Sequence, residues 1–197
     1  MKHKIRCSCG KLQGEVLQPE LGVRAICYCQ DCQAFASYLN KSNEVLDAAG
    51  GTEVVGLRPK NIVFTEGIEY LTCMSLSQKG LLRWFSKCCN TPIGNTPKNF
   101  KIAHVGLIHT CIDGAPSSLE GAFGRLDVRI NTGSAKQKPA ASKGMTKRIL
   151  AQLASLLRER ISGSYRQTPF FNRQTGEPVS QPVILDDEQR RQLNSAA

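Results

Sequence analysis

The clustering of the cysteines constrains this chain more than any other feature. The sequence contains nine cysteines, an odd number that cannot pair completely into disulfides within one chain. The tight groups are Cys7 with Cys9, Cys27 with Cys29 and Cys32, and Cys88 with Cys89, while Cys73 and Cys111 stand alone. Thiols two or three residues apart cannot easily bridge each other, but they can point at one ion. Such clusters therefore indicate metal ligands or redox thiols.

The expected compartment supports that interpretation. No run approaches the roughly 20 apolar residues that a membrane-spanning helix needs, so the sequence predicts no membrane span. Residues 1–6 are basic, but no apolar segment follows them, and a signal peptide is not predicted. A cytoplasmic location is therefore expected, and structural disulfides rarely persist in the reducing cytosol.

The C-x-C-x-x-C spacing of Cys27, Cys29 and Cys32 predicts a zinc site. Zinc in proteins prefers about four tetrahedral ligands, and such a loop can place three sulfurs around one ion. Three thiolates leave one position open, which is typical of catalytic zinc, whereas structural sites are closed. The alternatives are a redox-active trio and a structural site completed by a remote fourth ligand such as Cys73 or Cys111.

The other two groups predict a second site. Cys7 and Cys9 near the tip of a hairpin, with Cys88 and Cys89 far along the chain, form a pattern typical of a four-thiolate structural site. Adjacent cysteines in extended backbone point to opposite faces, so both reach one ion only from a tight turn. Asn90 and Pro92 make that turn possible. The alternative is that Cys89 alone ligates and the site is degenerate or empty.

The hydrophobic pattern predicts a mostly β fold through about residue 130. We expect a hairpin over 5–17, a strand over 23–27 that runs into the first zinc motif, and a short helix or turn over 33–40. Further strands are expected in NIVFTEG, IEYLTCMSL and LLRWFS. The longest strand is predicted over 102–112, with His104 and His109 facing opposite sides of it.

The composition changes after this β domain, which we place at 1–130. Residues 131–144 are small, polar and basic, as in a linker. An amphipathic basic helix is predicted over 145–162, packed on the β domain by its apolar face, followed by an extended, partly disordered tail over 163–197. The apolar stripe of the helix consists of Met145, Ile149, Leu153, Leu156, Leu157 and Ile161, and its basic residues include Lys147, Arg148, Arg158 and Arg160.

The net charge of +10 is concentrated near this helix, because residues 134–173 hold 9 Lys or Arg and 1 acidic residue. Such a stretch can attract nucleic acid or acidic membrane surfaces, although a solvated basic face is the simpler interpretation. The sequence has no standard nucleic-acid-binding motif. The oligomeric state does not follow from the sequence.

The order of the cysteine motifs resembles the family of glutathione-dependent formaldehyde-activating enzymes and centromere protein V. The motifs are CSCG at 7–10, CYCQDCQAF at 27–35 and RWFSKCCNTPIGN at 83–95, and the resemblance covers about residues 5–112. It implies a β-tent of small antiparallel sheets stapled by zinc. It assigns Cys7, Cys9 and Cys89 to a structural zinc, and Cys27, Cys29 and Cys32 to a catalytic one. Ser86 stands where the family has a further cysteine and Asn90 where it has glycine, and Cys88 takes over the missing ligand.

The resemblance implies one or two zinc ions per chain and a carbon–sulfur lyase acting on a thiol (glutathione) adduct of a small aldehyde. A cation near the anionic cysteine centre would help this chemistry, and Arg24, Lys41 and Lys87 are near it in sequence. The alternative function is a non-catalytic, zinc-stabilised binding module whose basic C-terminal region meets an anionic partner, since centromere protein V shows that the resemblance does not require the formaldehyde chemistry.

Overall fold

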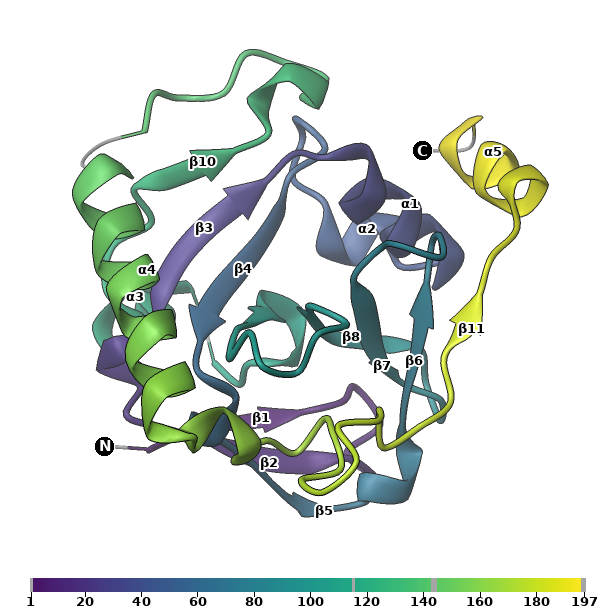
Figure 1. Ribbon diagram of the computed structural model, residues 1–197. Coiled ribbons are helices and arrows are strands. Elements are labelled where there is room, and N and C mark those ends of the chain that lie inside the picture. Colours follow the sequence, from purple (N-terminus) through teal and green to yellow (C-terminus); the bar gives the residue numbers. More distant parts are fainter. Residues whose placement is uncertain (1, 115, 143–144, 196–197) are drawn as a thin grey trace.

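Two sheets form the framework of the protein. The computed structural model describes residues 2–114, 116–142 and 145–195, and it shows a mostly β protein with a few helices (Figure 1). The larger sheet has eight strands in the order β10-β3-β4-β9-β8-β7-β6-β11. Only its edge pairs, β10 with β3 and β11 with β6, are parallel. Its strands are β3 (Val23–Cys27), β4 (Thr52–Leu57), β6 (Leu71–Ser75), β7 (Leu82–Ser86), β8 (Thr91–Thr96), β9 (Val105–Ile108), β10 (Val128–Ile130) and β11 (Val183–Ile184).

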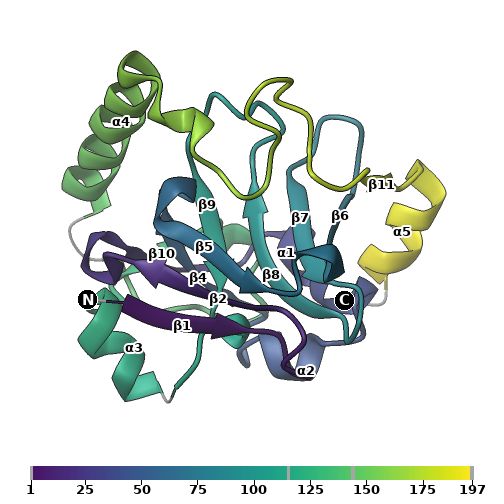
Figure 2. The same ribbon diagram turned by 90° about the horizontal axis from the view of Figure 1, so that it is seen from below.

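The smaller sheet has three antiparallel strands in the order β1-β2-β5 (Figure 2). They are β1 (Lys2–Arg6), β2 (Gln13–Leu17) and β5 (Ile62–Glu66). The hairpin expected over 5–17 is therefore present and begins at Lys2. Gly14 sits at a register shift between β2 and β5, where a Cβ would lie 2.4 Å from Val63 O. Only glycine allows the two strands to approach this closely.

In the described part of the chain, five α-helices surround the sheets: α1 (Gln30–Tyr38), α2 (Ser42–Val45), α3 (Pro116–Phe123), α4 (Met145–Ser162) and α5 (Asp187–Ser195). The main core surrounds the fully buried Trp84 between the two sheets. A second core lies where α1 and α2 cover the large sheet, around Phe35, Leu39 and Met74. Within the described residues, no helix is long and apolar enough to cross a membrane.

The strand predicted over 102–112 is wrong at both ends. β9 covers only Val105–Ile108, and a 3₁₀ helix follows it over His109–Cys111. Before it, Asn99 and Ile102 close tight turns, in which the Asn99 side chain accepts from Lys101 N and Ile102 O accepts from His104 N. Local hydrogen bonds thus replace strand pairing on both sides of the apolar run, and His104 and His109 do not share a strand.

The segments after residue 130 pack against the sheets. Asn131 and Ser134, in the range expected as a linker, contact residues around α1. Phe170, in the range expected as a tail, is fully buried and lies 5.1 Å from Trp84 between ring centroids. Further on, β11 pairs with β6, and Leu185 lies in the second core. The C-terminal third of the chain therefore completes both cores.

The helix α4 covers the range expected for an amphipathic helix, but it packs through polar side chains. Arg58 Nε donates to Ser155 Oγ at 2.9 Å, and Lys60 forms an ion pair with Glu159 at 2.6 Å. Glu159 is buried, so its charge needs this partner. The helix is held by a hydrogen-bonded and ionic interface with the segment between β4 and β5.

The apolar stripe of α4 points outward instead. Leu153, Leu157 and Ile161 are 57%, 59% and 79% exposed. The expectation that the helix packs by its apolar face is therefore wrong for these three residues, because polar partners on the domain select another face. Leu156, the other described member of the stripe, is half-buried. The side chains of Met145, Lys147, Arg148 and Ile149, which belong to the predicted faces, lie outside the described part of the chain.

Candidate metal centres

Four cysteines from two distant segments meet at one end of the smaller sheet. Cys7 and Cys9 come from the β1–β2 turn, and Cys88 and Cys89 come from the turn between β7 and β8. Cys88 Sγ lies 3.8 Å from Cys7 Sγ, 3.3 Å from Cys9 Sγ and 3.9 Å from Cys89 Sγ. All four sulfurs lie within 4.8 Å of one another. The structure thus brings together the four residues that the sequence assigned to one structural site.

A tight turn solves the problem of the adjacent cysteines. Asn90 has φ of 54°, a left-handed conformation that asparagine tolerates better than most residues, and its N–H donates to Ser86 O at 2.9 Å. The turn over 87–90 abolishes the alternation of an extended strand. Cys88 and Cys89 therefore both face Cys7 and Cys9.

Hydroxyl groups surround one side of this cluster. Cys89 Sγ lies 3.2 Å from Ser86 Oγ and 3.1 Å from Thr91 Oγ1. Burial raises the pKa of Cys89, but hydrogen bonds from Ser8, Ser86 and Thr91 outweigh it and lower the pKa to about 5. Ser86, which takes the place of a cysteine in the pattern that the sequence resembles, thus remains in contact with the cluster through its oxygen.

Cys27, Cys29 and Cys32 form a second cluster, where β3 ends and α1 begins. Cys27 is the last residue of β3, Cys29 caps α1, and Cys32 lies in its first turn. Cys27 Sγ and Cys29 Sγ are 3.4 Å apart, and the three sulfurs lie within 4.8 Å of one another. Among the described His, Cys, Asp and Glu residues, none joins these three as a fourth ligand.

The three thiols share negative charge. Hydrogen bonds from the Cys29 and Cys32 thiols, assisted by Asn131, hold the pKa of Cys27 well below its usual range. The same bond to Cys27 raises the pKa of Cys29 and of Cys32. One thiolate stabilised by two thiols is the metal-free form of a site whose ligands lose their protons when a cation binds.

Asn131 and Arg83 are the neighbours that sequence reasoning missed. Asn131 Nδ2 donates to Cys27 Sγ at 3.2 Å, from a residue with φ of 55° directly after β10. The fully buried Arg83 places Nη1 3.8 Å from Cys32 Sγ and donates to Asn95 Oδ1 at 3.2 Å. Both residues are far from the three cysteines in sequence. The Asn-Thr-Gly turn signal at 131–133 could have drawn attention to Asn131, but no local signal marks Arg83.

The cations that sequence proximity suggested lie elsewhere. Arg24 points to the other face of β3, where it pairs with Glu53 at 2.7 Å. Lys41 pairs with Glu44 at 2.7 Å, and Lys87 lies in the turn that carries Cys88. The buried cation beside the three-cysteine cluster is Arg83, because β7 runs past α1 in the folded sheet. Asp31, which lies 3.7 Å from Arg83, also bonds Arg190 of α5 at 2.9 Å.

The isolated cysteines are core residues. Cys73 and Cys111 are buried, and burial raises the pKa of each thiol to about 12. Neither belongs to a cysteine cluster, so neither is the remote fourth ligand that the sequence left open. His3 and His109 bond backbone carbonyls of Asp113 and Glu53.

Both clusters have donor sets that suit zinc. A tetrahedral site with zinc–sulfur bonds of about 2.3 Å has sulfur–sulfur edges of about 3.8 Å. Five of the nine sulfur–sulfur distances in the two clusters are 3.3–3.9 Å, close to these edges, and the other four are below 4.8 Å. The four-cysteine cluster supplies as many sulfurs as a tetrahedral site needs, and the three-cysteine cluster supplies one fewer.

Fold and clusters together define a mostly β protein with two sites among the described residues that could hold metal ions. The chain belongs to DUF6151, a family of unknown function, which matches residues 2–182. It is similar to a crystal structure of a Rhodobacter sphaeroides protein, with 18% identity, 64% of this chain and 98% of that chain covered, and a TM-score of 0.43. No curated protein matches the chain.

Proposed function

We propose that the three-cysteine cluster holds a zinc ion whose fourth position accepts a substrate thiol such as glutathione, and that the protein is a carbon–sulfur lyase of the glutathione-dependent formaldehyde-activating type. The observation that carries this proposal is the convergence of Cys27, Cys29 and Cys32 without a fourth ligand among the described His, Cys, Asp and Glu residues. Zinc with an open position lowers the pKa of a thiol that it binds.

The reaction is the reversible addition of the thiol to an aldehyde. In the forward direction a carbon–sulfur bond forms, the carbonyl π bond breaks, and the proton lost by the thiol ends on the former carbonyl oxygen. No oxidant or reductant is needed. The lyase direction breaks the same carbon–sulfur bond and returns the proton to the thiol.

The residues around the cluster have distinct tasks in this chemistry. Asn131 holds Cys27 through its amide hydrogen, and the first turn of α1 presents Cys32 at the positive end of the helix. Arg83 offsets the negative charge that accumulates when a further thiolate joins three cysteine thiolates. Its buried guanidinium cannot be screened by solvent as a surface cation would be.

The four-cysteine cluster has a different role in the proposal. A zinc ion held by Cys7, Cys9, Cys88 and Cys89 would join the β1–β2 hairpin to the β7–β8 turn and so staple the two sheets into a tent. Its four protein ligands leave no position for a substrate, which is typical of a structural site.

The test uses the full chain loaded with Co²⁺, whose visible absorption reports its ligands. Glutathione should change the absorption of the three-cysteine site, and glutathione with formaldehyde should turn over in the zinc form. Cys29→Ser should abolish both effects, whereas Cys73→Ser, with a hydroxyl able to keep the bond to Ser180 O, should preserve them. A wild-type protein that binds two metal ions but shows neither a thiol-dependent change nor turnover contradicts the proposal.

A second candidate function is supported by the outward stripe of α4. The exposed Leu153, Leu157 and Ile161 are flanked in sequence by the exposed Arg158 and Arg160, an arrangement suited to an anionic partner. Truncation cannot test this binding module, because the residues after α4 include the fully buried Phe170. The double substitution Arg158→Glu and Arg160→Glu, compared with Arg125→Glu, should selectively remove salt-dependent binding to DNA or RNA.

A further inference from the structure

One face of the β3–β4 pair links the three-cysteine cluster to a cavity. Directly opposed residues in an antiparallel pair share a face, and the faces alternate along each strand. The register pairs Cys27 with Thr52, Ala25 with Val54, and Val23 with Gly56. These three pairs therefore lie on one face, in a row that begins at the cluster and runs along both strands.

The lower part of this row is the floor of an apolar groove. The groove has a volume of about 230 Å³ and is lined by Val23, Ala25 and Val54, with Val128 and Ile130 of β10 beside them. Its wall on one side is formed by Gln152 and the partly exposed Leu153 of α4, the green helix beside β3 in Figure 1. Concave apolar sites with a few polar groups are where proteins most often bind small molecules.

The groove ends next to the cysteines. Ala25 precedes Cys27 by two residues on the same face, and a strand rises about 3.4 Å per residue, so the two side chains start about 7 Å apart. Ile130, which lines the groove, is the register partner of Cys27 on the other side. The groove therefore lies on the same face of the sheet as Cys27 and ends one residue pair before it.

A buried hydroxyl without a partner lies at this junction. Thr52 is 1% exposed, and its Oγ1 has no hydrogen-bond partner among the described residues. Burying an unpaired hydroxyl costs stability, and a threonine in a strand could be replaced by the isosteric valine. The hydroxyl has almost no exposed surface and does not line the groove, so a ligand oxygen would bond it only by entering from the groove end of this row.

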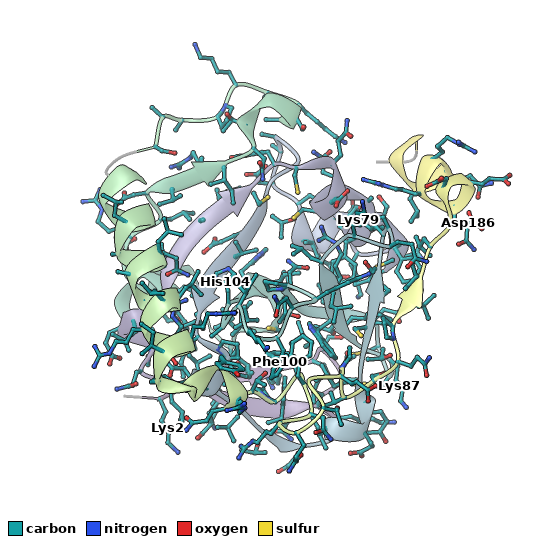
Figure 3. The ribbon with its side chains drawn as sticks, viewed as in Figure 1. Lys2, Lys79, Lys87, Phe100, His104 and Asp186 are labelled. Carbon is teal, nitrogen blue, oxygen red and sulfur yellow. The ribbon has the colours of Figure 1, made fainter. Side chains whose placement is uncertain are left out.

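The walls of the groove are uncharged. His104 lines it beside α4, where Figure 3 labels it, and its Nδ1 lies 3.0 Å from Gln152 Nε2. Burial and the nearby Arg58 lower the pKa of His104 to about 4, so the ring is neutral at neutral pH. An ionic group would find no counter-charge in this wall, whereas a hydrocarbon chain needs only the apolar contacts that the wall offers.

We propose that this face binds the aldehyde part of the substrate and that the aldehyde carries an aliphatic chain. The chain lies in the groove over Ala25 and Val54, and the oxygen of the carbonyl or of its thiol adduct accepts a hydrogen bond from Thr52 Oγ1 beside Cys27. This proposal rests on the proposed function, which it narrows from small aldehydes in general to those with an apolar tail.

The test measures binding of unreactive alcohols, which copy the oxygen and the chain of such aldehydes. Octan-1-ol and butan-1-ol are titrated into the metal-loaded full chain, and the methyl resonances of Ala25 and Val54 are followed by NMR. Affinity should rise about fourfold for each added methylene, the gain expected when a methylene leaves water for an apolar site. Equal affinities for the two alcohols, or no shift of these resonances, would overturn the proposal.

Two variants localise the effect. A Cβ on Gly106, another lining residue, would meet only Val54 at 3.7 Å, so Gly106→Leu should fill the groove and abolish octan-1-ol binding. Gly121→Leu, on the exposed side of α3 where a Cβ meets nothing within 4 Å, is the matched control and should bind as the wild type does. Unchanged binding to a folded Gly106→Leu variant contradicts the proposal. If that variant does not fold, the comparison of octan-1-ol with butan-1-ol in the wild type decides the question.

Thr52→Val tests the polar end. It should weaken octan-1-ol binding by about threefold to tenfold, the value of one hydrogen bond, without lowering the stability of the fold. Glutathione binding at Co²⁺ is measured in parallel. Alcohol binding that does not depend on chain length, together with a normal glutathione response, would contradict binding in the groove and leave the proposed function intact. A Co²⁺ absorption that does not respond to glutathione would contradict the proposed function itself.

Discussion

The two cysteine clusters use the same ligand type but differ in how the fold surrounds them. The four-cysteine cluster joins two turns from distant segments, and its neighbouring hydroxyls are engaged, since Thr91 Oγ1 accepts from Ser8 N at 2.9 Å and contacts Cys89. The three-cysteine cluster comes from one short segment that runs from the end of β3 into the first turn of α1. Beside it lie the buried Arg83 and the unpartnered hydroxyl of Thr52.

The difference teaches which cluster contributes to folding and which is available for chemistry. Cross-linking distant segments restricts the unfolded chain, so a closed site adds stability to the fold. A site within one loop restricts little, but its unsatisfied groups can meet a ligand. The predictions below test this division of roles, in order of decreasing effect.

Cys7→Ser should destabilise the protein by about 3 kcal/mol or more, because it breaks the four-sulfur link in the main core. The matched variant Cys29→Ser, at a half-buried position of the other cluster, should cost about 1 kcal/mol. Urea unfolding with zinc analysis by mass spectrometry measures both quantities. Equal losses of stability in the two variants would remove the proposed distinction between the clusters.

Cys88→Ser should lose the zinc of the four-cysteine cluster, and the added substitution Ser86→Cys should restore it. The reason is that Ser86 Oγ already lies 3.2 Å from Cys89 Sγ, so a thiol there would enter the same cluster. Zinc content per chain is the readout. If the double variant stays as metal-poor as the single one, position 86 is not equivalent to a ligand position.

Thr91→Val and Thr52→Val should have opposite effects on stability. Thr91→Val removes two hydrogen bonds that the buried Thr91 makes with the exposed Ser8, and it should cost about 1 kcal/mol. Thr52 loses nothing in the unliganded protein, so valine should be neutral or stabilising. Thermal unfolding of the two isosteric variants compares them directly, and a destabilised Thr52→Val would show that its hydroxyl has a structural partner.

Acid should weaken the fold through His104 on the groove side. Its pKa is lowered from 6.5 to about 4, so the folded state favours the neutral ring. The stability that the neutral ring contributes is complete above the pKa of the unfolded state and is lost as the pH falls from 6.5 towards 4. At about pH 5.5 the loss is about 1 kcal/mol. His104→Gln should reduce the difference in unfolding free energy between about pH 7.5 and pH 5.5. An unchanged pH dependence would mean that the ring is not buried in solution.

Much of the fold follows from local pattern. The β1–β2 hairpin, β3 and α1 appear where hydrophobic alternation and the C-x-C-x-x-C loop predict them. The strand over 102–112 fails because side-chain and turn hydrogen bonds of Asn99 and Ile102 compete with strand pairing, and the pattern alone gives no weight to such competition.

The predicted orientation of α4 is wrong for a related reason. The stripe of Leu153, Leu157 and Ile161 predicts a buried apolar face, but the orientation depends on what the domain offers opposite the helix. Arg58 and Lys60 offer polar partners, and the helix turns its polar face to them. Amphipathic periodicity identifies the faces of a helix but does not decide which one meets the protein.

The sequence by itself determined the grouping of the cysteines, because residues two or three apart in a loop have few ways to place their sulfurs. It also anticipated that Cys7, Cys9, Cys88 and Cys89 meet. Only the tertiary structure brought Arg83, Asn131 and Thr52 to the three-cysteine cluster and opened a groove beside it. These contacts depend on strand register and on the path of β7 and β10 past α1, and such long-range pairings leave no mark in local spacing.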